Sequence, residues 1–160
     1  MTTKIYLDSC IFLALYYERS EPQTRSIEKC LETLSKNENI KLITSDLTFT
    51  EFVKVALAPK KIPQETIFKD LSDMMRRKKI RNKFPFLIID VEGSKKKYSF
   101  GDFFVEMQEA LLYARPGISD VMHYVIMRNN NIKRIFTANE KDFKKFNELI
   151  VLTPKDCSQV

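Results

Sequence analysis

Acidic and amide side chains stand at four well-separated places in the chain, beside short apolar segments or at expected helix starts. They are Asp8, Glu51, Asp120 and the neighbouring Asn139 and Asp142. Two carboxylates about 4 Å apart repel each other by about 4 kcal/mol at an effective dielectric constant of about 20. Carboxylates that converge therefore need protons or a multivalent cation between them. Because hard oxygen ligands select Mg²⁺ or Mn²⁺ over zinc, these residues predict a divalent-cation site if the fold brings them together.

The elements that would position these residues follow from the spacing of apolar side chains. Short β-branched and aromatic runs predict strands, and apolar residues at helical spacing predict helices. The expected strands span 4–8, 41–45, 87–91, 134–138 and 149–153. The expected helices span 9–19, 22–37, 46–58 (with Asp46 as N-cap), 63–79, 101–114 and 117–130. This alternation predicts an α/β fold, a three-layer α/β/α sandwich with a mostly parallel sheet, in which residues 1–160 form one domain.

The acidic residues are expected to meet at one edge of that sheet. In such sheets, ligands bind beyond the carboxyl ends of the strands, where helices begin. Asp8 ends the first strand, and Glu51 lies one turn into the helix after the second. Asp120 lies in the first turn of its helix, and Asn139 and Asp142 follow the fourth strand. Four separate segments therefore deliver oxygen atoms to the same rim.

Each of these residues also has a purely structural interpretation. Asp8 could cap the first helix, and Asp120 could complement a helix dipole. Glu51 could be a solvated helix residue, although its neighbours are apolar. Beside them, Ser9 could contact metal or phosphate or cap the helix, and Thr137 could orient Asp142 or end its strand. The coincidence of all the acids at one edge favours the metal site.

The overall charge favours a polyanionic partner. The formal net charge is +6 and the pI is near 9.2, which raises the odds of a nucleic-acid partner. The densest basic runs lie within 74–83 and at 95–97. They could contact phosphates without reading sequence, or they could be solvated ends of secondary structure.

Other patterns exclude several classes of protein. The chain has neither GxGxxG nor GxxxxGK[ST], which argues against a nucleotide-binding loop. Cys10, Cys30 and Cys157 form no CxxC pair and no zinc pattern with His123, the single histidine. We therefore expect reduced thiols and a cytoplasmic protein, with no membrane partner because no stretch approaches about 20 apolar residues. We interpret His123 as a satisfied buried histidine, with a catalytic base as the alternative.

Taken in order, four segments resemble the PIN-domain family along essentially the whole chain. They read LDSCIFLAL, TFTEFVKV, GISDVMHYVIM and IFTANEKDF. Members of this family are compact α/β/α metal-dependent nucleases. The resemblance implies that Asp8, Glu51 and Asp120 are the three main acids and that Asp142 is the acid before phenylalanine. Asn139 departs from the pattern, because many members have aspartate there and an amide carries no charge.

The resemblance also implies a reaction and partners. It implies that Mg²⁺ or Mn²⁺ assists hydrolysis of single-stranded RNA, leaving 5′-phosphate and 3′-hydroxyl ends. The short chain is similar to VapC-type toxins, which implies an antitoxin protein as a partner and a homodimer. An RNA-processing nuclease that is not a toxin is the near alternative.

Two further functions are open at this point. One is a catalytically weak PIN scaffold that binds RNA or protein, which Asn139 favours and the retained acids oppose. The other is a haloacid-dehalogenase-like phosphatase. That family requires a second aspartate two residues after the first, where this chain has Cys10. The metal-dependent endoribonuclease is the interpretation that uses all the acids.

Overall fold

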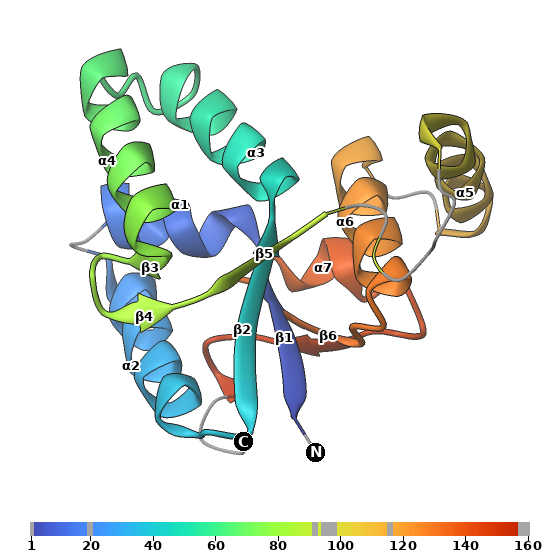
Figure 1. Ribbon diagram of the computed structural model, residues 1–160, viewed down its shortest axis with the longest axis horizontal. Helices are drawn as coiled ribbons and strands as arrows, with labels where there is room; N and C mark the ends of the chain where they lie inside the picture. The colour runs from blue at the N-terminus through green and yellow to red at the C-terminus, as the bar shows by residue number, and fades with distance from the viewer. Residues whose placement is uncertain (1, 19–20, 91–92, 94–98, 115–116, 157–160) are drawn as a thin grey trace.

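Five parallel strands form the central sheet of the protein (Figure 1). The structure is a computed structural model, and it describes residues 2–18, 21–90, 93, 99–114 and 117–156. The strands are β1 (Thr3–Leu7), β2 (Ile40–Ser45), β5 (Leu87–Ile89), β6 (Arg134–Phe136) and β7 (Ile150–Leu152). They lie in the order β5-β2-β1-β6-β7, and every neighbouring pair is parallel. The predicted sheet and its strands are confirmed.

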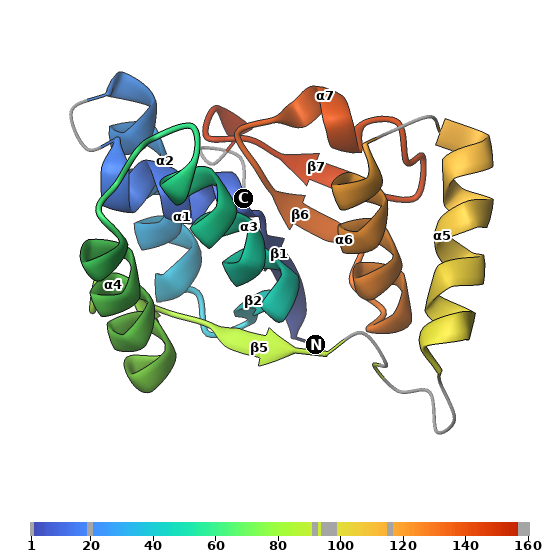
Figure 2. The same ribbon diagram turned by 90° about the horizontal axis from the view of Figure 1, so that it is seen from above.

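Helices cover both faces of the sheet, so the protein has three layers (Figures 1 and 2). The helices are α1 (Ser9–Tyr17), α2 (Pro22–Lys36), α3 (Asp46–Leu57), α4 (Gln64–Arg77), α5 (Phe100–Ala114), α6 (Ile118–Asn129) and α7 (Glu140–Phe143). The first four lie on one side of the sheet, and α5, α6 and α7 lie on the other. The α/β/α sandwich expected from the sequence is confirmed.

The side-chain alternation along β1 explains the two hydrophobic cores. Ile5 and Leu7 pack into the core beneath α1–α4, whereas Tyr6 between them packs into the core beneath α5–α7. All three side chains are fully buried. Because helices cover both faces of the sheet at these three positions, the run lacks the polar alternation of a one-sided sheet. The first strand therefore anchors both layers.

The structure corrects the expected boundaries in one region. The helix predicted to reach residue 79 ends at Arg77, because Lys78 adopts a left-handed conformation with φ of 49°. A short antiparallel hairpin then follows, formed by β3 (Lys79–Ile80) and β4 (Phe84–Pro85). Its turn places Arg81 and Asn82 at positive φ. Strands of two residues give no periodic signal, so the sequence did not predict this hairpin.

Smaller differences concern a helix cap and the cysteines. Asp46 is the first helical residue of α3 and Ser45 occupies the N-cap, so the assignment of Asp46 as the cap was wrong by one position. Cys10 is a free thiol, whereas Cys30 is disulfide-bonded, and the expectation of reduced thiols is wrong for Cys30. Cys157 lies outside the described residues. Within the described part of the chain, no helix is both long enough and apolar enough to span a bilayer.

Candidate metal centre

Asp8 lies at the point where β1 gives way to α1. It occupies the N-cap of α1 in an extended conformation, and its side chain is only 6% exposed. Its Oδ1 accepts a hydrogen bond from the backbone N–H of Ser9 at 2.6 Å and a weaker one from the Ser9 hydroxyl at 3.3 Å. The capping interpretation of Asp8 is therefore correct, and it fixes the direction of the carboxylate. Capping and metal binding are compatible, because Oδ2 faces a different set of neighbours.

The neighbouring strand holds the second oxygen of Asp8. The Thr137 hydroxyl, just after β6, donates to Asp8 Oδ2 at 2.6 Å, and the Cys10 thiol donates to the same atom at 3.0 Å. Thr137 also accepts from the backbone N–H of Asn139 at 2.9 Å. Burial, together with the negative charge of Asp8, raises the pKa of the Cys10 thiol. Cys10 therefore acts as a neutral donor, and Thr137 orients Asp8 instead of Asp142.

Thr137→Val should weaken the site without unfolding the protein. Valine keeps the shape of threonine but removes the hydroxyl, so Asp8 Oδ2 loses its shortest hydrogen bond. Loss of such a supporting contact typically costs about 10- to 100-fold in metal affinity or activity. Mn²⁺ binding measured by electron paramagnetic resonance checks this. Thr137→Ser retains the hydroxyl and should bind Mn²⁺ nearly as the wild type does; equal binding by the valine variant would contradict the role given to Thr137.

Glu51 reaches the same place from α3 and is held at both oxygens. Its Oε1 accepts a hydrogen bond from the Ser119 hydroxyl, and its Oε2 lies 2.7 Å from His123 Nε2. Burial favours a higher pKa for Glu51, but the hydrogen bond and charge of His123, with smaller contributions from Ser9 and Lys54, together outweigh it, so the pKa is lowered. Glu51 is therefore ionised at neutral pH, and it is not the solvated helix residue of the alternative interpretation.

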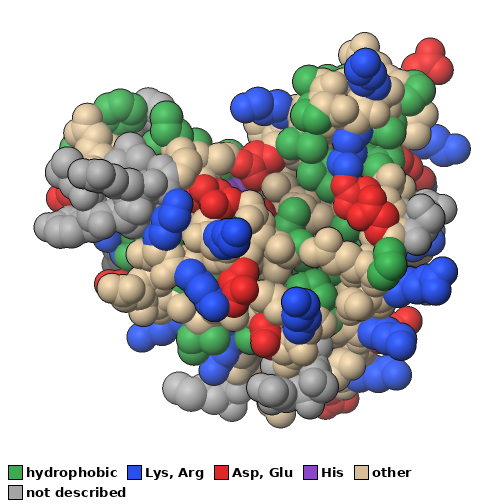
Figure 3. Space-filling model, turned by 180° about the vertical axis from the view of Figure 1, so that it is seen from behind, with side chains coloured by type: hydrophobic (Ala, Val, Ile, Leu, Met, Phe, Trp, Pro, Cys, Tyr) green, Lys and Arg blue, Asp and Glu red, His purple; other side chains and the backbone are tan. Residues whose placement is uncertain are grey.

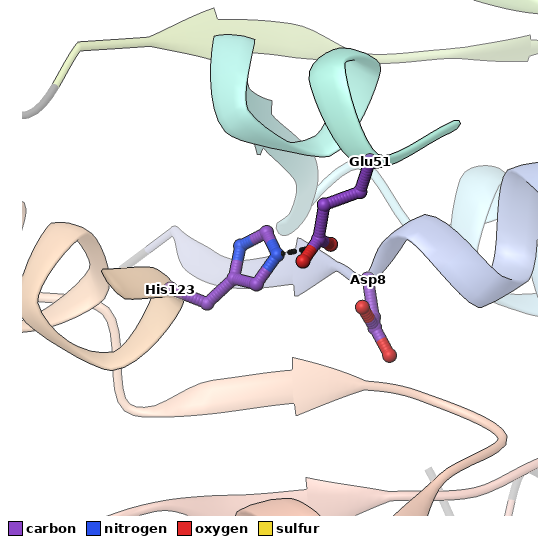
Figure 4. A group of neighbouring side chains, drawn as sticks. All are labelled: Asp8, Glu51 and His123. Carbon is purple, nitrogen blue, oxygen red and sulfur yellow. Dashed lines mark hydrogen bonds and ion pairs between the residues drawn. The ribbon is translucent and has the colours of Figure 1, made fainter. Parts of the chain in front are cut away.

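Asp8, Glu51 and His123 form the group of potential ligands that the structure brings closest together. One ligand atom from each lies within 4.8 Å of the others (Figure 4). Among the described residues, this is the arrangement of histidine, cysteine and acidic side chains that could hold a metal ion. His123 was not predicted from the sequence as a ligand. Its position three residues after Asp120, on the same helix face, was the signal that could have placed it here.

Asp120, Asn139 and Asp142 lie outside this closest group but remain electrostatically linked to it. Asp120 Oδ2 accepts a hydrogen bond from the backbone N–H of Gly117 at 3.2 Å. Burial raises the pKa of Asp120, and the negative charges of Asp142 and, to a smaller extent, Asp8 raise it further. The Asn139 amide donates to Asp142 Oδ2. The charges of these acids thus influence one another, as those of acids around a cation site do.

The acidic rim is open to solvent on one side of the molecule. Acidic side chains and the histidine gather in a hollow between the lobe of α3 and α4 and the lobe of α5 and α6 (Figure 3). Oxygen donors from Asp8 and Glu51, with Asp120 and Asp142 nearby, fit a hard divalent cation such as Mg²⁺.

The basic run within 74–83 makes contacts inside the protein. Lys83 Nζ lies 2.9 Å from Glu28 Oε1 on α2, and Arg81 approaches the same carboxylate at 3.9 Å. Arg76 pairs with Asp73 on its own helix at 3.0 Å. These contacts agree with the structural interpretation, and contact with RNA stays a prediction. The second basic run, at 95–97, lies outside the described residues.

Comparison with known families assigns the chain to one of them. The family model of the PIN domain matches residues 5–149, which is most of the chain. The chain belongs to the PIN-domain family. No curated protein matches the sequence significantly.

Two solved structures share the fold at low sequence identity. One is a chain of the VapBC2 complex from Rickettsia felis, solved with a DNA fragment from its promoter. It is 19% identical, covers 94% of this chain and 98% of its own, and has a TM-score of 0.64. The other is Mycobacterium tuberculosis VapC20, described as a toxin that cleaves the sarcin-ricin loop. It is 13% identical, covers 82% of this chain and 86% of its own, and has a TM-score of 0.55. At these identities, the likeness concerns the fold alone.

Proposed function

We propose that this protein is an endoribonuclease that hydrolyses single-stranded RNA with Mg²⁺ or Mn²⁺ at the acidic rim. The observation that carries the proposal is the close approach of Asp8, at the N-cap of α1, and Glu51, on α3, whose ligand oxygens lie within 4.8 Å of each other (Figure 4). Two buried or half-buried carboxylates with oxygens within 4.8 Å of each other repel, and a cation between them relieves that repulsion. Membership of the PIN-domain family supports the same chemistry.

The proposed roles of the residues follow from their contacts. A bound divalent ion would lower the pKa of a water molecule and polarise the scissile phosphate. Asp8 and Glu51 would hold the ion, since hydrogen bonds fix both carboxylates. Asp120 and Asp142 would contribute charge from the solvent side, directly or through water. Asn139 would orient Asp142 through its amide and offer a neutral oxygen.

The proposed partners rest on the two solved structures. One was solved as a VapBC complex with promoter DNA, and the other is named as a toxin that cleaves an RNA loop. We propose that this chain is likewise the toxin of a toxin–antitoxin pair, acting as a single-domain protein and a homodimer in the cytoplasm. An antitoxin segment that covers the acidic rim would restrain it.

Incubation of the purified protein with end-labelled single-stranded RNA tests the function. We expect cleavage with Mg²⁺ or Mn²⁺, none with EDTA, and products with 5′-phosphate and 3′-hydroxyl ends. Cleavage that persists in EDTA would contradict the proposed reaction. Binding of RNA without cleavage under any metal would favour the PIN scaffold, which the uncharged Asn139 also favours.

A further inference from the structure

A chain of buried polar groups lies behind Glu51, on the side away from solvent. The Tyr6 hydroxyl lies 2.8 Å from His123 Nδ1 and 3.3 Å from Thr48 Oγ1, and it also bonds Ser45 Oγ. At its other end, His123 Nε2 lies 2.7 Å from Glu51 Oε2. Tyr6 and Thr48 are fully buried, and Ser45 and His123 are 1% exposed. These hydrogen bonds therefore connect the core of the sheet to Glu51, the candidate metal ligand.

The contacts of the imidazole ring decide what His123 can do. A carboxylate accepts hydrogen bonds and cannot donate one, so Nε2 must carry the proton that it shares with Glu51. A nitrogen that carries a proton has no free lone pair for a metal ion. The other nitrogen, Nδ1, faces the Tyr6 hydroxyl inside the protein. Although Nε2 lies within 4.8 Å of the acidic oxygens, neither ring nitrogen is available as a ligand.

We propose that His123 is a positioning residue for Glu51 and not a metal ligand, and that Tyr6 fixes the ring in the orientation this requires. The positioning role rests on the proposed function, because it assumes that Glu51 serves the metal. With Ser119 on Oε1 and His123 on Oε2, the Glu51 carboxylate is held at both oxygens. Each oxygen keeps a second lone pair, so the grip orients the carboxylate without using up its capacity to bind an ion.

The role of His123 determines which metal ions the site favours. If His123 bound the ion through nitrogen, the site would suit zinc and other transition metals as well as Mg²⁺. If His123 only donates a hydrogen bond to Glu51, the metal ligands are oxygens alone, and the site favours Mg²⁺ or Mn²⁺. His123, although histidine is a common zinc ligand, would thus orient the Glu51 carboxylate, as the hydrogen-bond partners of metal ligands commonly do.

Nitrogen-15 NMR of the full chain tests the assignment directly, because His123 is its single histidine. Long-range proton–nitrogen spectra, recorded without metal and with saturating Mg²⁺, report which ring nitrogen carries a proton. We expect Nε2 to be protonated under both conditions. An Nε2 that is unprotonated without metal, or that loses its proton when Mg²⁺ is added, would overturn the assignment.

Tyr6→Phe tests the role of the tyrosine, with Tyr17→Phe as the matched control. Both variants lose one hydroxyl, but that of Tyr17 bonds Asp70 on α4, away from the acidic rim. We expect Tyr6→Phe to weaken Mn²⁺ binding by about 10- to 100-fold, measured by electron paramagnetic resonance with the metal alone. Tyr17→Phe should bind Mn²⁺ as the wild type does. Unchanged binding by a folded Tyr6→Phe protein would overturn the role of Tyr6.

The two proposals fail in different ways. A wild-type protein that binds no Mn²⁺ would overturn the proposed function, whatever the protonation of His123. A protein that binds Mn²⁺ and loses the Nε2 proton in Mg²⁺ would overturn only the assignment of His123. Retention of that proton together with a weakened Tyr6→Phe variant would support both.

Discussion

Asp8→Asn should abolish metal-dependent RNA cleavage while leaving the protein at least as stable as the wild type. Asparagine is as good a helix N-cap as aspartate, so the hydrogen bond from Ser9 is retained. The Thr137 hydroxyl can rotate to accept from the new amide. The change removes one negative charge close to Glu51 and Asp120, which relieves repulsion in the metal-free protein. The same charge is the one that the cation needs, so cleavage should fall by at least about 100-fold.

Thermal unfolding with and without Mn²⁺ measures the stability and the metal binding of the variant, and the RNA-cleavage assay measures its activity. A ligand at 100 times its Kd stabilises a protein by about 2.7 kcal/mol, so Mn²⁺ should raise the Tm of the wild type. The Asp8→Asn variant should show no such rise. Asp73→Asn makes the same chemical change on an exposed part of α4 and should behave as the wild type. A cleaving Asp8→Asn variant, or one as strongly stabilised by Mn²⁺ as the wild type, would remove Asp8 from the site.

The fold was predictable because both faces of its strands are covered. β1 and β2 each end in a run of buried residues, and such runs separated by amphipathic helices leave few arrangements other than a parallel sheet between two layers. The hairpin of β3 and β4 escaped prediction because it depends on the left-handed residues Lys78, Arg81 and Asn82, not on periodicity. α7 is a single short turn that no spacing reveals.

The site was predictable only in its outline. The rule that parallel strands deliver ligands to one edge placed Asp8 and Glu51 correctly at the same rim. This rule does not predict which side chains form hydrogen bonds with these two carboxylates. The contacts of Thr137 with Asp8 and of His123 with Glu51 join residues 129 and 72 positions apart, respectively. Such pairs depend on strand register and helix rotation, which are tertiary properties.

Phe52→Ala should produce the largest loss of stability of any substitution considered, because Phe52 joins α3 to the core next to Glu51. Its side chain is fully buried. Its ring stacks on Tyr17 with a centroid distance of 5.4 Å and meets Tyr16 edge-on at 5.9 Å. Replacing a buried phenylalanine with alanine typically costs about 3–5 kcal/mol in the free energy of unfolding. In a chain of this length the Tm should fall by roughly 6–20 °C.

Phe68→Ala is the matched control, because Phe68 is 49% exposed on the neighbouring helix α4. The same atoms are removed there, but little buried area is lost, so the expected change is within about 1 kcal/mol. Chemical denaturation of both variants, monitored by circular dichroism, gives the two free energies. Similar losses for the two variants would mean that α3 does not pack on α1 as described. Because α3 carries Glu51, a destabilised Phe52→Ala protein should also bind Mn²⁺ more weakly at temperatures just below its transition.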